Sequence, residues 1–330
     1  MLYELNINDK KEVDIINKFI SDNTGVEYTQ TIEWNIIRTE KIKHILYYKD
    51  RNKKILWCCS LFEKKYDDEK IIYAPRGPII DYNNINIFLD TIYEWCRKKD
   101  YKKLIINPII ESNVLSKIDK KFVYSITEKN DYSHLYESCK LAIMPIIFDE
   151  EELIKKLPSK FRQNTRRSYR KGLTFKNPSN IDLKNFYNLY IQTSKRHEFN
   201  PHDLNYFQKI INTFNDKLVY FEVWKDDKPL AMSIDLIFRD KLIYLYGVSS
   251  TENRNMLGMY NLQWETIKYC INNRIKYYDF GGVFCEENDY ENKDYGLYKF
   301  KQGYCYEGFK DIVPDLIFKI EEEKNDKYCI

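Results

Sequence analysis

The spacing of apolar positions in the second half of the chain predicts a helix between two sets of strands. Leu257, Tyr260, Trp264, Ile267 and Ile271 recur three and four residues apart, which places them on one face of a helix. Three strand-like runs separated by polar turns precede this helix and one short run follows it: Lys217–Trp224, Leu230–Phe238, Lys241–Val248 and Lys276–Phe280.

The first half repeats the same order of elements. Strand-like runs at His44–Lys49, Lys54–Glu63 and Lys70–Ala74 lead through a proline-rich turn into a helix near Asn84–Lys98, and a short buried strand follows at Lys103–Ile106. Three antiparallel strands, a loop, a helix and another strand form the core order of GNAT-type acyltransferase domains. Alternation of this kind also occurs in other α+β proteins.

We therefore expect an α+β fold of tandem GNAT-like domains, each a mixed, mainly antiparallel sheet flanked by helices. An acidic run at 150–152 opens an amphipathic helix that Pro158 ends, so we place the join near 149–159. The residues after Pro314 can pack back on the first domain. The expected domains are 1–148 together with 312–330, and 149–311.

Composition is that of an ordinary globular protein. The 330 residues are 43% hydrophobic and 31% charged, with a net charge of +3, which is too small to indicate a partner. The eight cysteines form no CxxC pair and no cluster with histidine, so zinc is not expected. The N-terminus has no apolar leader and no segment reaches the about 18 apolar residues of a membrane span. We expect a cytoplasmic protein and leave peripheral membrane contact open.

A strongly basic segment follows the predicted domain join. Residues 153–181 hold nine Lys and Arg and no Asp or Glu, and Ser159 and Gly172 are suitable helix caps. In a helix, Arg162, Arg166 and Arg170 share one face, with Lys160, Arg167 and Lys171 beside them. Such a face predicts an anionic partner, with nucleic-acid phosphates as one candidate. The alternative is a solvated helix neutralised by carboxylates elsewhere in the fold.

Two further segments place polar groups beside strand ends. The strand at 276–280 runs into Asp279-Phe280-Gly281-Gly282, and paired glycines let a ligand approach the backbone closely. Phe300-Lys301 follows among aromatic residues, where a half-desolvated lysine suits a site at which negative charge develops. In the first half, two prolines stiffen the turn Ala74–Pro78, so Arg76 would lose little backbone entropy on binding a ligand. The alternative is a rigid turn with no binding role.

The loop 251–258 bears on the donor. Acyl-CoA enzymes of the GNAT type cradle a pyrophosphate on backbone N–H groups at this position. Their Arg/Gln-x-x-Gly-x-Gly/Ala pattern is reduced here to Arg254 and Gly258 at a different spacing, which argues against coenzyme A.

Taken in order, several segments resemble the FemABX family of peptidoglycan bridge-forming aminoacyltransferases. They are Tyr28–Trp34, Tyr73–Asp81, Ile105–Pro108, Lys160–Gly172, Thr193–Phe199, Tyr244–Ser250, Asn261–Glu265, Tyr278–Val283 and Gly296–Gly303. The resemblance implies tandem GNAT-like domains of the compact form without a coiled-coil arm. It also implies transfer from aminoacyl-tRNA to the stem-peptide amine of a lipid-linked or UDP-linked muropeptide. Neither coenzyme A nor a metal would be needed, and we expect a monomer.

The same resemblance implies roles for individual residues. Phe300 and Lys301 occupy the place where the family stabilises the tetrahedral oxyanion. Tyr246 would line the second-domain site and Arg196 would lie near the cleft, while Arg38 falls near a cation that holds the acceptor's phosphates. The chain departs from the family at Asn107, where some members carry Asp. Asp279 is a candidate proton acceptor, with a conformational role at the strand end as its alternative.

Two other functions are consistent with the sequence. One is an acyl-CoA-dependent tandem-GNAT N-acyltransferase, which saturable coenzyme A binding would support. The other is a non-catalytic RNA-binding module, which would bind tRNA without modifying a precursor.

Overall fold

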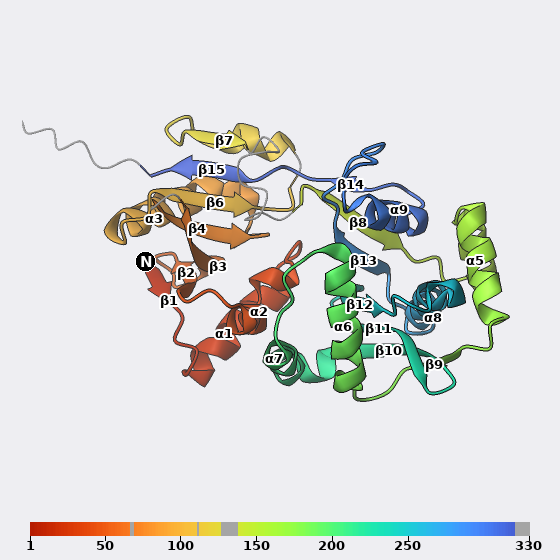
Figure 1. Ribbon diagram of the computed structural model, residues 1–330. Helices are drawn as coiled ribbons and strands as arrows, with labels where there is room; N and C mark the ends of the chain where they lie inside the picture. Colours follow the sequence, from red (N-terminus) through yellow and green to blue (C-terminus); the bar gives the residue numbers. More distant parts are fainter. Residues whose placement is uncertain (67–68, 111, 127–137, 321–330) are drawn as a thin grey trace, which may run out of the picture. The chain divides into compact units, whose positions relative to one another are not determined.

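The computed structural model describes residues 1–66, 69–110, 112–126 and 138–320. The chain forms two compact units, one of Met1–Cys139 with Ile312–Ile330 and the other of Lys140–Asp311 (Figure 1). Each unit has its own sheet and its own apolar core. The predicted α+β class is confirmed.

The sheet of the first unit has the strand order β1-β2-β3-β4-β6-β15-β7, with β5 beside β3. Its neighbours are antiparallel except for β4 and β6, which are parallel and are joined through α3. The strands are β1 Leu2–Glu4, β2 Lys43–Lys49, β3 Ile55–Tyr66, β4 Glu69–Pro75, β5 Ile79–Ile80, β6 Lys103–Asn107, β7 Tyr124–Ile126 and β15 Leu316–Lys319, and the helices are α1 Lys10–Asp22, α2 Ile32–Ile37 and α3 Ile85–Lys98.

The sheet of the second unit has the order β14-β8-β13-β12-β11-β10-β9, in which β12 and β13 are parallel. The strands are β8 Lys140–Pro145, β9 Thr174–Lys176, β10 Leu218–Lys225, β11 Lys228–Phe238, β12 Lys241–Ser249, β13 Tyr277–Gly282 and β14 Lys310–Asp311. The helices are α4 Glu150–Lys156, α5 Ser159–Tyr169, α6 Leu183–His197, α7 Leu204–Phe214, α8 Gly258–Asn272 and α9 Tyr295–Tyr304.

The two sheets share one topology, as the repeated pattern predicts. In each, three antiparallel strands pass through a helix into a strand parallel to the third, and that strand then pairs antiparallel with a strand from elsewhere in the chain. In the first sheet this added strand is β15, and in the second it is β8. The predicted boundary at 148 is therefore corrected to 139, because β8 pairs with β13 and β14.

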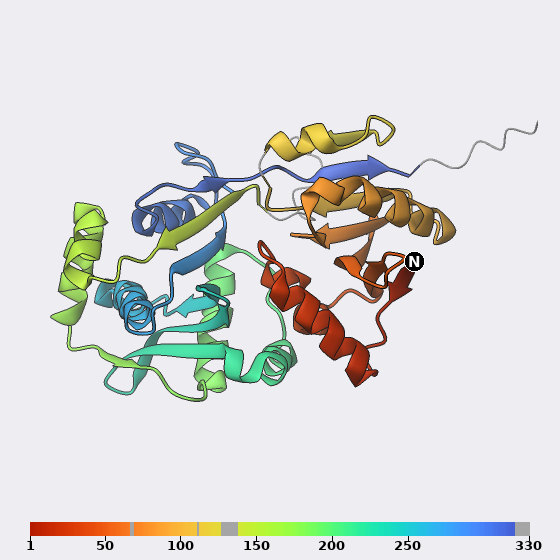
Figure 2. The same ribbon diagram turned by 180° about the vertical axis from the view of Figure 1, so that it is seen from behind.

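Helices cover both faces of the second sheet (Figures 1 and 2). On one face, Trp264 and Ile267 of α8 pack with Ala231 and Leu242 in the apolar core. On the other face, α6 and α7 pack through aromatic contacts of Tyr190 and Phe207 with β12. Burying each large apolar side chain in this way stabilises the fold by roughly 1.5–3 kcal/mol.

Candidate active site

The end of β13 is tied to α9 by a buried lysine. Lys301 is 8% exposed and its Nζ donates to the carbonyl oxygen of Gly282 over 2.6 Å. Phe300, the preceding residue of α9, is half-buried and contacts the rings of Phe280 and Tyr304. The segment that the sequence singles out therefore brings Phe300, Lys301 and the paired glycines together.

Burial lowers the pKa of Lys301 to about 8, and the charge of Asp279 acts in the opposite direction. Asp279 is itself held in place, since one carboxylate oxygen accepts from the Gly281 N–H at 2.8 Å and the other lies 3.8 Å from the Lys241 ammonium. Gly281 has a positive φ of 78°, which suits the turn that this carboxylate closes. These contacts favour the conformational role of Asp279 over that of proton acceptor.

His197, at the end of α6, lies within electrostatic reach of Asp294 beside α9. Asp294, beside the start of α9, raises the pKa of both Lys301 and His197, although burial and the charge of Arg196 lower the pKa of His197 overall. Arg196 donates to the Ser249 carbonyl at 3.2 Å and to the Thr251 hydroxyl at 2.8 Å. Arg196 thus anchors the loop that follows β12.

A bulge in β12 separates two tyrosines that a regular strand would place on the same face. Asp235 lies opposite Tyr244 while its neighbour Ile234 lies opposite Tyr246, so Leu245 is the extra residue. Tyr244 packs with Tyr278 and Phe280 on the α8 side. Tyr246, on the other side, shares a 2.9 Å hydrogen bond with the Tyr206 hydroxyl of α7. Sequence alternation alone could not have shown this change of face.

Asp235 was not identified from the sequence. It is fully buried on β11, where the Tyr278 hydroxyl donates to one of its oxygens at 3.3 Å. Burial raises the pKa of Asp235 to about 8, against the opposing effects of Ser233 and Tyr278. The signal for it was a lone carboxylate in the apolar run Leu230–Phe238.

The basic segment forms helix α5, whose two sides differ. Phe161, Asn164, Thr165 and Ser168 are buried, whereas the cations at positions 160, 166, 167 and 170 are exposed. No ion pair joins these four cations to a carboxylate within the described residues. The internal neutralisation considered above is therefore not seen for them in this part of the chain.

Two predictions on this helix are corrected. Ser159 is the first helical residue and not the cap, because the chain turns at Pro158, whose side chain makes no capping bond. Arg162 points away from the exposed basic face and donates to the carbonyls of Leu157 at 2.7 Å and Lys155 at 3.3 Å. It satisfies the end of α4, where backbone carbonyls lack helical partners. The last helical residue is Tyr169, and Arg170 is the C-cap. Lys171, which is half-buried, and Gly172, which has a φ of 66°, follow it.

In the first unit, Arg76 and Asn107 are both buried and bonded to each other. The Arg76 guanidinium donates to the Asn107 side-chain oxygen at 2.5 Å and to the Ser138 carbonyl at 2.9 Å. Asn107 ends β6, and Arg76 follows β4 with a positive φ of 55°. The pair joins the ends of two parallel strands, where ligands of α/β sheets often bind.

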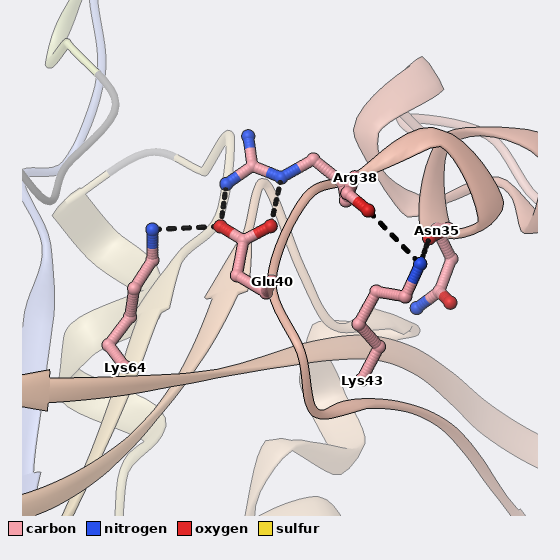
Figure 3. Close-up of polar contacts among 5 residues, drawn as sticks. All are labelled: Asn35, Arg38, Glu40, Lys43 and Lys64. Atoms are coloured by element: carbon pink, nitrogen blue, oxygen red, sulfur yellow. Dashed lines mark hydrogen bonds and ion pairs between the residues drawn. The ribbon is translucent and has the colours of Figure 1, made fainter. Parts of the chain in front are cut away.

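Arg38 lies elsewhere in the first unit, in a cluster with a carboxylate that the sequence did not indicate (Figure 3). Arg38 Nε donates to one oxygen of Glu40 at 2.9 Å, one of its terminal nitrogens donates to the other, and Lys64 Nζ lies 2.8 Å from that second oxygen. Burial acts to raise the pKa of Glu40, but Arg38 and Lys64 outweigh it and hold the pKa at about 2. The one sequence feature that could have pointed to this cluster is that Arg38 and Glu40 lie two residues apart after α2.

The described residues contain no helix long and apolar enough to cross a membrane. Within the same residues, no group of three His, Cys, Asp or Glu side chains is arranged to hold a metal ion.

The sequence model of the FemAB family matches residues 12–137, 142–224 and 220–309. The chain is 22% identical over 334 residues to the UDP-N-acetylmuramoylpentapeptide-lysine N(6)-alanyltransferase of Weissella viridescens, covering 94% of this chain and 95% of the relative. It is also 22% identical to the lipid II:glycine glycyltransferase of Staphylococcus aureus, covering 70% of this chain and 73% of that protein.

Solved structures are similar in fold. The crystal structure of FemX superposes with a TM-score of 0.80 at 17% identity and covers 97% of both chains. A tandem GNAT protein from the clavulanic acid biosynthesis pathway has a TM-score of 0.56 at 9% identity, covering 98% of this chain and 99% of that one. The predicted tandem GNAT-like architecture is thereby confirmed.

Proposed function

Since the chain belongs to the FemAB family, whose model matches most of its length, we propose that it moves an amino acid from aminoacyl-tRNA to the stem-peptide amine of a peptidoglycan precursor. This transfer would extend an interpeptide bridge. Neither coenzyme A nor a metal enters the proposed reaction. The alanyl and glycyl transfers named for the two relatives support an aminoacyl donor of this kind.

The buried Lys301 ammonium carries the proposal. When a neutral amine attacks the aminoacyl ester, the carbonyl oxygen gains negative charge in the tetrahedral intermediate. Lys301 already donates one N–H to Gly282 and has further N–H groups for this oxygen. Because the site is desolvated, its positive charge stabilises the oxyanion more strongly than it would in water.

The ester needs little other activation, so positioning does most of the work. The C–N bond forms in the tetrahedral intermediate, whose collapse breaks the bond to the ribose oxygen, and the proton lost by the amine is gained by that oxygen. Both oxygens of Asp279 are engaged by Gly281 and Lys241. We therefore assign this proton transfer to water or to the substrates themselves.

Helix α5 supports tRNA as the donor. Its exposed cations lie on the side opposite Phe161, whose ring contacts Tyr260 of α8 and Tyr304 of α9. A rigid helix that presents cations to solvent suits the regular phosphates of an RNA backbone. We propose that Lys160, Arg166, Arg167 and Arg170 contact the tRNA, with Lys171 at the edge of this face.

The acceptor in this proposal carries a diphosphate, as does the UDP-linked acceptor for which the Weissella viridescens relative is named. We propose Arg38 as a cation for those phosphates, and Arg76 with Asn107 as the polar end of the acceptor side. Tyr246 and Arg196 are proposed as substrate contacts in the second unit.

The donor is tested by following the ester bond of a labelled aminoacyl-tRNA. Adding protein and precursor should release the label from tRNA and place it on the precursor, for charged pools of alanine, glycine and serine tested separately. Acetyl-coenzyme A in place of charged tRNA should give no transfer. Transfer from coenzyme A alone would replace this proposal with the acyl-CoA alternative.

A further inference from the structure

Helix α5 carries two aromatic side chains whose environments differ. Phe161 is 8% exposed, and its ring packs edge-on against the rings of Tyr260 and Tyr304. Tyr169, the last residue of the helix, is 45% exposed, and no other aromatic ring contacts it within the described residues. The apolar core accounts for the position of Phe161, whereas the exposed ring of Tyr169 needs another explanation.

Two residues of α8 hold the Tyr169 ring in one orientation. The Tyr169 hydroxyl donates to Glu265 at 2.6 Å, and the Lys268 ammonium lies over the ring, 5.4 Å from its centroid. Lys268 and Glu265 also form an ion pair at 2.8 Å, so the three side chains support one another. Burial and the hydrogen bond to Glu265 raise the pKa of Tyr169, so the hydroxyl stays neutral. The ring is therefore fixed at its edge and on one face, which leaves the opposite face for a planar partner.

Cations lie beside this ring on the surface of α5. Arg166 precedes Tyr169 by three residues, which makes the two side chains neighbours on the helix, and Arg170 follows it directly. Both arginines are exposed, and the Glu265 carboxylate pairs with Lys268 instead of with either of them. In proteins that bind single-stranded nucleic acid, bases stack on aromatic rings while neighbouring cations contact the phosphates. The end of α5 has this combination of groups.

We propose that Tyr169 is a stacking site for an unpaired nucleobase of the RNA donor, with Arg166 and Arg170 on the adjacent phosphates. The inference rests on the proposed function, because it assigns the site to the tRNA of that reaction. Tyr169 lies about 12 Å along the helix axis from Phe161, which contacts α9, the helix of Lys301. The aminoacyl ester is carried by the last nucleotide of the 3′ single strand, so the unpaired nucleotides before it are the ones that extend along α5. Every base has a flat face, so stacking here requires no particular sequence.

The Tyr169 ring is tested with two RNA minihelices that share one stem, one with the 3′ single strand and one blunt. The full chain is compared with Tyr169→Leu, which removes the ring, and with Tyr169→Phe, which keeps the ring but loses the bond to Glu265. Tyr3→Leu is the matched control, because Tyr3 of β1 is 37% exposed and has the Lys49 ammonium 5.4 Å from its ring centroid. Affinities are measured over a range of salt concentrations. Quenching of 2-aminopurine, placed at each unpaired position in turn, reports stacking.

Tyr169→Leu is expected to weaken binding of the minihelix with the single strand about tenfold, the equivalent of about 1.4 kcal/mol, and to abolish the quenching. Its affinity for the blunt minihelix and its slope of log K against log salt should match those of wild type, because no phosphate contact is lost. Tyr169→Phe and Tyr3→Leu should stay within twofold of wild type on both RNAs.

Three results would overturn the role of Tyr169 in stacking. They are equal losses on both minihelices, a loss in Tyr169→Phe as large as in Tyr169→Leu, and unchanged binding by Tyr169→Leu. Failure of the wild-type protein to bind either minihelix would instead contradict tRNA as the donor in the proposed function.

Discussion

Lys301 donates from α9 to the carbonyl of Gly282, the last residue of β13, over 2.6 Å. This contact links the glycine pair at the strand end to the lysine nineteen positions later, two features that are separate in the sequence. It places a cation in a desolvated position at the place where the proposed reaction builds up negative charge.

Replacing Lys301 with Met should reduce turnover by a factor on the order of 10²–10³, the usual effect of removing one oxyanion donor. The methionine chain is of similar length and apolar, so the fold should persist. Turnover is measured with charged tRNA and precursor, and circular dichroism checks the fold. Near-normal turnover in a folded variant would remove Lys301 from this role.

Lys301 should also set an alkaline limit to activity. Because burial lowers its pKa to about 8, the ammonium is present below that pH and is lost above it. Turnover should therefore fall as pH rises through about 8, and Lys301→Met should lack this limb. A wild-type profile that stays level up to pH 9.5 would contradict the assignment.

The lowered pKa of Lys301 also predicts that stability rises with pH, whereas turnover falls. The unfolded lysine has a pKa of about 10.4 and the folded one about 8, so between these values the unfolded state binds more protons. The free energy of unfolding contributed by Lys301 should rise with pH across this window, by on the order of 3 kcal/mol in total. Urea unfolding of wild type and Lys301→Met at pH 7 and pH 10 gives the difference in their free energies of unfolding at each pH. The change in this difference between the two pH values measures the contribution of Lys301.

Charge reversal on the exposed side of α5 should weaken tRNA binding. Arg166→Glu with Arg170→Glu removes two proposed phosphate contacts, which should flatten the slope of log K against log salt by roughly 0.7–0.9 per contact. Arg162→Ala is the matched comparison on the same helix. It should cost about 1 kcal/mol of stability, because Arg162 bonds the end of α4, and leave the salt slope unchanged. Identical salt slopes for the double variant and wild type would exclude this face.

Gly303 is where α9 meets α5. A Cβ at this position would lie 1.9 Å from the Phe161 ring, whereas a Cβ at Gly296 of the same helix would have nothing within 4 Å. Gly303→Ala should therefore destabilise the protein by about 1–3 kcal/mol, while Gly296→Ala should be neutral or up to about 1 kcal/mol stabilising. Equal thermal midpoints for the two variants would contradict the packing described here.

The sequence predicted the elements that depend on local pattern. The apolar stripe of α8 and the alternating strands β10, β11 and β12 were identified because their periodicity reflects burial within each element. The boundary at β8 was misplaced because strand pairing joins residues far apart in the chain, as Met144 with Tyr278. No local pattern contains that information.

At the candidate site, residue type was a better guide than residue direction. The sequence singled out Lys301 and Asp279 by residue type alone, whereas the bulge at Leu245 that turns Tyr244 and Tyr246 to opposite faces is a property of the sheet. Arg162 has the same spacing as Arg166 and Arg170, yet it bonds backbone carbonyls because α4 ends beside it. Glu40 was not singled out because its ion pair with Lys64 of β3 joins residues that are far apart in the sequence.

The central claim is tested most directly by weighing the precursor after incubation with the protein and charged tRNA. UDP-linked and lipid-linked muropeptides are each offered with separately charged tRNA pools, and tandem mass spectrometry locates any added mass. The account predicts a gain of one or more aminoacyl residues on the stem-peptide amine, only when the tRNA is charged. An unmodified precursor in every combination, or a gain that requires acyl-coenzyme A, would contradict it.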